Sequence, residues 1–455
     1  MMRRRVPKAG RVLLTCVLVL PTPALALERL CDPANENCRT PLIDLIRNER
    51  TGIDVGFWFM EDARYTYELI NRFKAGVPVR VLVDPRANSS TPANASRLAE
   101  LANAGIPMRK RIASGILHWK AMIFAGQRVV QFSGANYSGE AFKYVSPYTN
   151  YIDEAILFTS NEWVVSSFMT RFDDIWQNTK SYANYANVSG PLLRRYPNYG
   201  YTGVMNFPPT HDFGAWAVNE YNAETRQIDA IVYRITDRRH TDALIAARQR
   251  GVTVRLITEP KQYRDPSRLW HSWSVDRMYM AGIAIRHRAH AGLMHQKSTV
   301  LRGRARTIFG SSNWTTPSAT SQEEHNYFTG RPSILQWFVA QFERKWNNST
   351  GYAETTAFTP LPPDKPVYVS PANGTRVSGT VTLKWKPGYW AHKADVYFGT
   401  SSIPPLLTQD VTVSPNSTAS LTISNLAAGR TYYWRIVSKT MANQTAGGAV
   451  WAIGS

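Results

Sequence analysis

Runs of apolar residues separated by an amphipathic segment organise the first part of the chain. Residues 55–60 form an apolar run short enough for a buried strand, and an amphipathic segment follows. Basic Lys74 and then Gly76 predict the end of a helix, because glycine favours the backbone conformation found beyond a helix C-terminus. Residues 77–82 then form a second apolar run, so the pattern predicts a strand–helix–strand unit.

This pattern occurs twice. Residues 53–85 and 228–260 align without a gap at an offset of 175 positions, with Asp54 matched by Asp229 among several identities. A repeat of this length indicates a duplicated structural unit. Since strands alternate with helices, each copy predicts an α/β half-domain in which helices cover both faces of a parallel or mixed sheet.

The pattern changes beyond a proline-rich stretch near residues 358–364. Short β-rich runs then recur with almost no helical pattern, which predicts an all-β sandwich. The run from Leu426 to Lys439 resembles the penultimate strand and tyrosine corner of a fibronectin type III domain. The predicted organisation is a signal peptide, two α/β/α half-domains that form one pseudo-twofold site, a linker and a β-sandwich, at residues 1–26, 27–195, 196–357, 358–364 and 365–455.

The N-terminus has the three parts of a secretory signal. Five basic residues precede an apolar stretch at residues 12–20 that is too short for a bilayer, and an Ala-Leu-Ala sequence ends at Ala26. We expect cleavage after Ala26 and a secreted protein, extracellular or periplasmic. A short membrane anchor is the alternative, which Pro21 and Pro23 disfavour. No long apolar run follows, so we expect a soluble mature chain with at most transient contact with a membrane surface.

Cysteine and charge narrow the chemistry further. Cleavage removes Cys16 and leaves Cys31 and Cys38, which predict a small disulfide loop in an oxidising compartment. A metal site is the alternative, but no histidine has convincing metal-ligand spacing, so we expect no metal and no other cofactor. The net charge is +20, or +15 after loss of the five basic residues. Such a charge favours polyanionic partners, either nucleic acid or an acidic membrane face.

Two short motifs carry the candidate chemistry. His118 and Lys120 recur 177 positions later as His295 and Lys297. Residues i and i+2 of a strand share a face, so each motif presents an imidazole beside an ammonium group. If the two halves come together, both pairs surround one point, where they would suit a phosphodiester.

Asn136 and Asn313 each lie sixteen residues beyond these lysines. The paired His-x-Lys motifs and the downstream Gly-Ser-x-Asn segments resemble those of the phospholipase D superfamily, over roughly residues 40–350. The resemblance implies a two-step reaction without an obligatory metal: one histidine forms a phosphohistidine, and the other acts as acid and then as base. The lysines and asparagines would hold the phosphoryl oxygens. A monomer would suffice, since one chain carries both halves.

The chain also departs from that family. The family motif continues to an aspartate five residues beyond each lysine, where this chain has Ala125 and Arg302. The first half has Ser-Gly where the family has Gly-Ser. Because the missing aspartates look more like supports for the motif than groups that act on phosphorus, we still expect activity.

An acid that orients a catalytic histidine is the remaining expected part. Glu323 and Glu324 fall where the family carries this acid in the second half, and we expect Glu324 to take part in catalysis. In the first half Tyr148 lies near the equivalent place, and Asp153 and Glu154 follow slightly later. The asymmetry indicates that the two histidines differ in role.

Four residues next to the motifs are candidates for substrate contact, although aromatic side chains are more often part of a core; they are Trp119, Tyr137, Ser311 and Trp314. The first hypothesis is a secreted phosphodiesterase that hydrolyses phospholipids. The second is a metal-independent endonuclease that cuts DNA or RNA by the same chemistry, and the third is an inactive phosphate-binding adaptor. The sequence does not identify a partner for the C-terminal domain.

Overall fold

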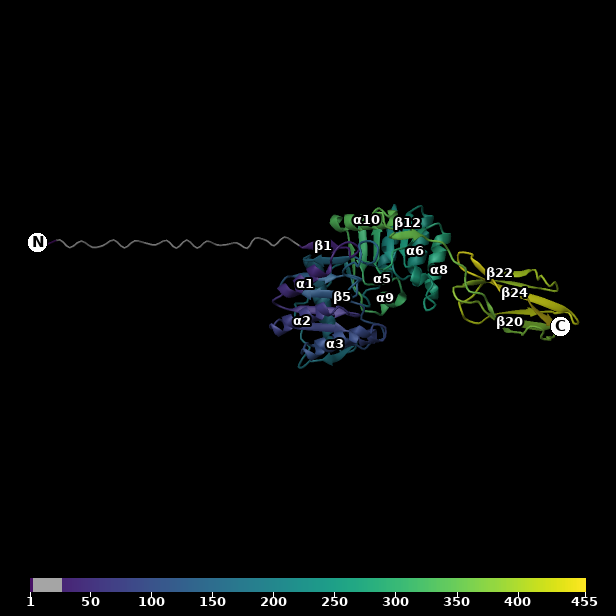
Figure 1. Cartoon of the computed structure of the whole chain (residues 1–455), viewed down its shortest axis with the longest axis horizontal. Coiled ribbons are helices and arrows are strands. Elements are labelled where there is room, and N and C mark those ends of the chain that lie inside the picture. Colours follow the sequence, from purple (N-terminus) through teal and green to yellow (C-terminus); the bar gives the residue numbers. More distant parts are fainter. Residues whose placement is uncertain (3–26) are drawn as a thin grey trace.

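A computed structural model describes residues 1–2 and 27–455; residues 3–26, with the predicted cleavage site and Cys16, lie outside the described residues. Two eight-stranded sheets with helices around them form the body of the molecule, and an all-β region lies at one end (Figure 1). Among the described helices, none combines the length and apolar character needed to cross a membrane.

The first half forms a mixed sheet in the order β1-β8-β6-β5-β2-β3-β4-β9. Strands β2, β3 and β4 are parallel, and β5 is antiparallel to β2. The strands are β1 (Glu28–Cys31), β2 (Ile53–Phe57), β3 (Val79–Val83), β4 (Met108–Arg111), β5 (Lys120–Phe124), β6 (Val129–Phe132), β8 (Ile156–Thr159) and β9 (Tyr182–Ala186). The α-helices are α1 (Arg39–Asn48), α2 (Ala63–Lys74), α3 (Pro92–Asn103) and α4 (Glu162–Gln177).

The second half has the same strand order, β10-β17-β16-β15-β11-β12-β13-β18, which confirms a mixed α/β fold built from two similar halves. The strands are β10 (Met205–Asn206), β11 (Gln227–Val232), β12 (Thr253–Thr258), β13 (Ala284–Arg288), β15 (Lys297–Leu301), β16 (Arg306–Gly310), β17 (Asn326–Thr329) and β18 (Thr355–Ala357). The helices are α5 (Phe213–Ala223), α6 (Arg238–Gln249), α7 (Pro260–Tyr263), α8 (Leu269–Met280), α9 (Thr316–Thr320) and α10 (Pro332–Asn347).

The repeated aspartates and arginines have a structural role. Asp54 on β2 pairs with Arg80 on β3, with 2.8 Å between Oδ1 and Nε. Asp229 on β11 pairs with Arg255 on β12 at 2.7 Å. Both carboxylates are fully or almost fully buried, so the loss of either arginine would remove one of the two cations that stabilise a buried charge. The identities at these positions therefore preserve the parallel strand pair.

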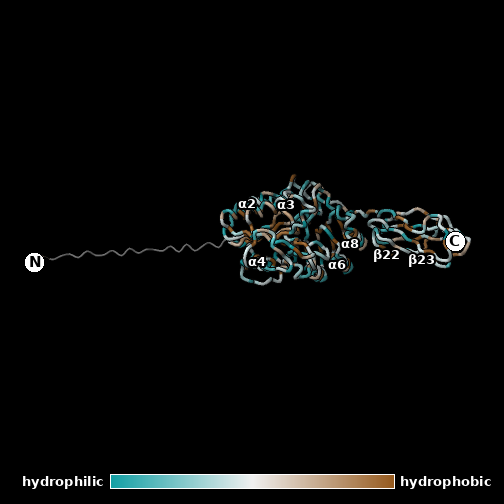
Figure 2. Tube along the Cα trace, turned by 90° about the horizontal axis from the view of Figure 1, so that it is seen from below, coloured by the Kyte–Doolittle hydropathy of each residue, from teal (hydrophilic) through white to brown (hydrophobic). Residues whose placement is uncertain are grey.

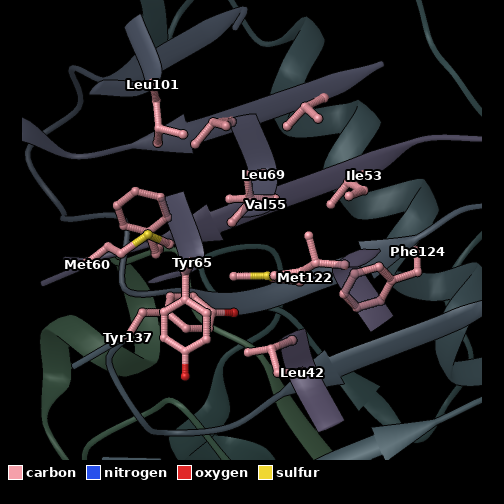
Figure 3. Close-up of a cluster of buried hydrophobic side chains, with 14 of the residues drawn as sticks. Leu42, Ile53, Val55, Met60, Tyr65, Leu69, Leu101, Met122, Phe124 and Tyr137 are labelled. Atoms are coloured by element: carbon pink, nitrogen blue, oxygen red, sulfur yellow. The ribbon is translucent and has the colours of Figure 1, made fainter. Parts of the chain in front are cut away.

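Alternate residues of each strand fill different cores. In the first half, Met122 and Phe124 of β5 pack under α1, α2 and α3, and Figure 3 shows part of this cluster. Ala121 and Ile123 point to the opposite face, where α4 packs. Figure 2 shows hydrophobic segments gathered within the body of the molecule, as this alternation requires.

The core under α4 continues into the second half. It includes Val300 and Phe309 of the second sheet and Phe338 of α10. The rings of Phe132 and Phe309 stack with centroids 5.7 Å apart. Because one core contains side chains of both halves, burial of apolar surface holds them together.

A disulfide joins Cys31, at the end of β1, to Cys38, immediately before α1. Both cysteines are buried in the core under α1, α2 and α3. The link therefore closes the β1–α1 loop against the edge of the first sheet.

The C-terminal region contains two facing β-sheets. One has the order β19-β20-β23, and the other contains β22, β21, β24 and β25, with β26 on β24. Their strands are β19 (Val367–Ser370), β20 (Thr380–Lys386), β21 (Lys393–Gly399), β22 (Leu406–Thr412), β23 (Ala419–Ser424), β24 (Thr431–Lys439), β25 (Thr445–Gly447) and β26 (Trp451–Gly454). Trp385 and Trp434, from different sheets, share one core. The backbone N–H of Ala427 donates to the Tyr432 hydroxyl at 3.0 Å, the contact expected of a tyrosine corner.

Candidate active site

The two His-x-Lys motifs lie at equivalent strand ends. His118 precedes β5 and His295 precedes β15, and each lysine is the first residue of its strand. The ammonium of Lys120 donates to the carbonyl of His118 at 2.7 Å, and Lys297 makes the same contact with His295. His118, Lys120 and Lys297 are buried, and His295 is half-buried.

The charges of each motif act on the histidine of the other. Burial and the positive charges of Lys120 and Lys297 hold the pKa of His118 well below its usual value. Burial, Lys297 and Lys120 do the same for the pKa of His295. Each histidine therefore feels a lysine of the opposite half, and in the free site the neutral imidazole is favoured over the imidazolium.

Each histidine is hydrogen-bonded to a glutamate of the other half. The Nδ1 of His118 lies 2.8 Å from Oε2 of Glu324, and the Nδ1 of His295 lies 2.6 Å from Oε1 of Glu154. A carboxylate at Nδ1 fixes the imidazole with its Nε2 lone pair free and stabilises the imidazolium form. The acids are exchanged between the halves, so neither half contains a complete His–Glu pair.

Backbone hydrogen bonds between short parallel segments bring each glutamate to the histidine of the other half. The amide of His118 donates to the Glu323 carbonyl at 2.9 Å, and that of His295 donates to the Asp153 carbonyl at 3.2 Å. The second contact belongs to a two-stranded sheet of β7 (Ile152–Asp153) and β14 (Leu293–Met294). Backbone pairing thus sets the acid-bearing segment of one half beside the histidine of the other.

Two glycines at the 177-residue offset permit these contacts. A Cβ on Gly115 would lie 1.9 Å from the carbonyl oxygen of Ser321, and a Cβ on Gly292 would lie 1.7 Å from that of Tyr151. Any side chain there would force the crossing backbones apart. Both glycines are therefore required for the close approach of the two halves.

The residue before each glutamate is a buried acid held by basic side chains. Glu323 accepts from Arg111 and Arg171, both at 2.7 Å. Asp153 contacts Lys345 and lies 2.5 Å from Nε2 of His290. These ion pairs hold the acid-bearing segments in place, although different side chains form them in the two halves.

The two glutamates are themselves unusual acids. Burial raises the pKa of Glu154 and of Glu324 to about 7, against the lowering effect of the nearby lysines. Burial also lowers the pKa of Lys297 to about 8. A bound phosphate would favour the charged lysines, because an anion stabilises a neighbouring cation.

The two asparagines take equivalent places. Asn136 is half-buried and Asn313 is 7% exposed. Within residues 27–455, the amide oxygens of both are buried and have no hydrogen-bond partner. Side-chain amides in this setting can supply donors for phosphoryl oxygens. Among residues 27–455, no group of three or more His, Cys, Asp or Glu side chains is placed to hold a metal ion.

Three of the predicted substrate contacts need correction. Trp119 is fully buried and its indole N–H donates to the Glu324 carbonyl at 3.1 Å. Trp314 stacks on His240 with centroids 4.5 Å apart, and Tyr137 lies in the core of Figure 3. These aromatic side chains fill cores, since their apolar area is more stable there than at a polar site.

Ser311, the fourth, is also fully buried and contacts an acid of the site. Its hydroxyl donates to Oε2 of Glu324 at 2.5 Å. The matching position of the first half is Gly134, where a Cβ would lie 2.8 Å from Oε2 of Glu154. The reversed Ser-Gly order therefore leaves room for Glu154.

Sequence reasoning did not assign a site role to Glu154. Tyr148, named as the near equivalent of the second-half acid, instead accepts a hydrogen bond from the Asn35 side chain at 2.8 Å. The acidic pair 153–154 matches 323–324 in type, but extra residues after Asn136 displace it from the 177-residue offset. The presence of two adjacent acidic residues, and not their distance from Asn136, was therefore the sequence signal that could have identified Glu154.

The two positions at which the family has an aspartate lie far along the strands from the histidines. Ala125 and Arg302 follow the opposite ends of β5 and β15, five residues beyond the lysines, or about 16 Å along a strand. Arg302 pairs with Asp229 at 2.7 Å, and Ala125 packs against the inter-half core. The substitutions therefore change the scaffold and leave the His-x-Lys groups in place.

Known proteins support this architecture. Mitochondrial cardiolipin hydrolase of Chlamydomonas reinhardtii is 30% identical over 123 residues, or 27% of this chain and 52% of that protein. The human protein of that name is 31% identical over 117 residues, 26% of this chain and 42% of its own length. The chain thus spans about half the length of these relatives.

Two solved structures share the fold. Phosphatidylserine synthase of Haemophilus influenzae has a TM-score of 0.54 at 14% identity, covering 73% of this chain and 87% of that one. Polyphosphate kinase of Porphyromonas gingivalis has a TM-score of 0.50 at 13% identity, covering 70% and 47%. The family model described as "Cardiolipin synthase, PLD-like domain" matches residues 42–176 and 220–346, more than half of the chain. The protein therefore belongs to the family of PLD-like domains described by the cardiolipin synthase model.

Proposed function

We propose that this protein is a secreted phosphodiesterase that hydrolyses phospholipids through a phosphohistidine. The observation that carries the proposal is the exchange of acids: each histidine contacts a glutamate of the other half, and the charges of Lys120 and Lys297 act on both histidines. Relatives named cardiolipin hydrolases support a phospholipid substrate. The basic N-terminal segment that ends at Ala26 supports secretion.

In the first step, Nε2 of one histidine attacks phosphorus and the bond from phosphorus to the leaving oxygen breaks. The other histidine first takes up a proton from solvent when the anionic phosphodiester binds, because the anion stabilises the imidazolium, and then donates this proton to the leaving oxygen. Lys120, Lys297 and the two asparagine amides hold the non-bridging oxygens as charge builds on them. The glutamate behind each imidazole stabilises the positive charge that the ring acquires.

In the second step, the histidine that lost its proton takes one from water, and the water oxygen attacks the phosphohistidine. The phosphorus–nitrogen bond breaks and the phosphate product leaves. Acid and base roles thus alternate on one side of the site, while the other side holds the covalent intermediate.

The test uses residues 27–455 with EDTA and no added metal. Phosphatidylcholine in mixed micelles is compared with single-stranded and duplex DNA, and release of choline and cleavage of DNA are measured. Choline release that is lost in His118→Ala and in His295→Ala is expected. No lipid turnover, with DNA cleavage retained, would overturn the proposal.

A nuclease is the second candidate, favoured by the charge of +15 that remains after signal cleavage. It predicts cleavage of DNA that weakens steeply with salt, whereas turnover of micellar lipid depends on an interface. Failure of both reactions, with phosphate analogues still bound, would favour the adaptor hypothesis. We also propose that the protein acts as a monomer and that the C-terminal domain is a fibronectin type III-like module.

A further inference from the structure

The middle residue of each His-x-Lys motif has no part in the proposed reaction. Trp119 stands between His118 and Lys120, and Gln296 holds the same place in the second half. Both side chains are buried, and Trp119 lies in the core that contains side chains of both halves. Because buried polar groups are normally hydrogen-bonded, the partners of this indole and this amide indicate a role for the two residues.

Trp119 holds the backbone of the acid that His118 uses. Its indole N–H donates to the carbonyl of Glu324 at 3.1 Å. The carboxylate of the same glutamate lies 2.8 Å from Nδ1 of His118. Two consecutive residues of the first half therefore contact both the backbone and the carboxylate of one glutamate of the second half.

Gln296 reaches the acid of His295 through one more side chain. The Nε2 of Gln296 donates to Oε1 of Gln341, on α10, at 2.8 Å. The Nε2 of Gln341 donates to the carbonyl of Glu154 at 3.2 Å and to Oδ2 of Asp32 at 2.9 Å. Because an ionised carboxylate accepts but does not donate, Asp32 fixes which end of the Gln341 amide faces Glu154. Glu154 is in turn the glutamate at Nδ1 of His295.

The backbone carbonyls of the two glutamates depend on these side chains. Glu154 and Glu324 are almost fully buried, and within residues 27–455 no backbone N–H donates to either carbonyl. A buried carbonyl that loses its donor is costly, so the amide and the indole fix the backbone of each acid. A displaced backbone would carry its carboxylate away from the imidazole, and catalytic groups tolerate little displacement.

The two contacts differ in chemistry but end on the same atom. An indole in one case and a pair of glutamines in the other lead to the backbone carbonyl of equivalent glutamates. Packing alone requires a side chain of suitable volume, and it does not require a donor aimed at one carbonyl. The shared end point therefore indicates a requirement on the position of the acid.

We propose that Trp119 positions Glu324, and that Gln341, with Gln296 behind it, positions Glu154. The middle residue of each motif thereby keeps in place the acid that stabilises the histidine of its own motif. None of the three acts on phosphorus, so they are positioning residues. This inference rests on the proposed function, because it concerns the alignment of the acids that the reaction uses.

Kinetic variants test the effect on the reaction. Trp119→Phe removes the N–H and keeps an aromatic ring, and Gln341→Met removes the amide at similar volume. Each is expected to lower kcat for choline release about five- to tenfold and to leave KM unchanged. The controls are Trp176→Phe, in the same core as Trp119, and Gln177→Met, whose side chain donates to the Leu192 carbonyl at 2.8 Å on the surface. Neither control should change kcat.

Double variants separate positioning from a general loss of stability. In a Glu324→Gln background, Trp119→Phe is expected to lower kcat by less than about twofold, because the acid that it positions has already lost its charge. Gln341→Met should behave in the same way in a Glu154→Gln background. Loss of the full single-variant factor in either background would overturn the assignment for that pair.

A spectroscopic measurement distinguishes failure of this inference from failure of the proposed function. Residues 27–455 carry isotope-labelled histidine without substrate, and the proton resonance of each Nδ1–H that faces a glutamate is assigned with His118→Asn and His295→Asn. Trp119→Phe is expected to shift only the resonance of His118, and Gln341→Met only that of His295, whether or not phospholipid is hydrolysed. Circular dichroism checks folding, and Gln296→Met is the second variant for the resonance of His295. Resonances that stay unchanged, or that both shift in each variant, would overturn the proposal.

Discussion

The two halves present the same His-x-Lys pair on the same order of strands, yet they support it differently. Glu324 accepts a hydrogen bond from Ser311, whereas Gly134 stands at the matching place beside Glu154. The buried acid before each glutamate is held by two arginines in one case and by a lysine and a histidine in the other. Duplication thus preserved the reacting groups while their supports diverged.

A second difference concerns the surroundings of the site. Arg234 follows β11, but Phe59 occupies the corresponding position after β2. The first half has an acidic recess where the second has a basic one. Such differences are compatible with one active site because a phosphodiester is itself asymmetric, with a leaving group on one side only. The residues that the repeat preserves are therefore the proposed reacting groups. The residues that differ around them can give the two histidines different roles and can select the substrate.

The largest effect is expected from the histidines. His118→Asn and His295→Asn should each reduce kcat on phosphatidylcholine by about 10³-fold or more, because nucleophile and acid act in one reaction. Quenching of single-turnover reactions with denaturant at alkaline pH, where the phosphorus–nitrogen bond is stable, followed by peptide mapping, should find phosphohistidine on only one of the two residues. Phosphate on both histidines of the wild type would break the proposed division of roles.

A smaller loss is expected from the exchanged acids. Glu154→Gln and Glu324→Gln should each lower kcat about 10²-fold, because an amide does not stabilise the imidazolium as a carboxylate does. Ser311→Ala should lower it only severalfold, since Glu324 keeps its charge but loses one hydrogen bond. Steady-state kinetics would measure kcat of each variant, with circular dichroism as a folding control. Equal effects of Ser311→Ala and Glu324→Gln would show that the hydroxyl matters as much as the charge of the acid.

The glycines test whether the halves must approach closely. Gly115→Ala and Gly292→Ala should each lower the free energy of unfolding by about 1–3 kcal/mol and reduce kcat roughly tenfold, because each Cβ meets a backbone carbonyl. Gly203→Ala is the control, as a Cβ there meets no atom within 4 Å. Denaturant unfolding and activity are measured together. Unchanged activity in both variants would show that the crossing contacts can relax without moving the acids.

The smallest effect is a change in pH dependence. Burial lowers the pKa of Lys297 to about 8, so the free enzyme loses this positive charge as the pH rises through that value. The value of kcat/KM for phosphatidylcholine should therefore fall at alkaline pH. Lys297→Arg should be slower at neutral pH but should keep its rate to higher pH, because guanidinium stays protonated. An alkaline limb that does not move would belong to another group.

Much of this architecture was predictable from the residues. Asp54 and Asp229 locate matching strands, and Asp62 and Asp237 cap the following helices by accepting from backbone N–H groups. The periodicity predicted these elements because burial of alternate strand residues is a local property of the sequence. The aromatic residues beside the motifs were harder to assign, since the same apolar side chain suits a core or a pocket until its neighbours are known.

The sequence by itself determined the duplication, the mixed α/β half-domains and the two His-x-Lys motifs at strand ends. Only the tertiary structure decided that Glu154 contacts His295 and Glu324 contacts His118, each across the boundary between halves. It also decided that Arg234 and Arg268 lie in one recess. The physical reason is that periodicity and capping act between residues a few positions apart. Contacts between residues more than a hundred positions apart depend on how the two sheets pack, and no local pattern records that.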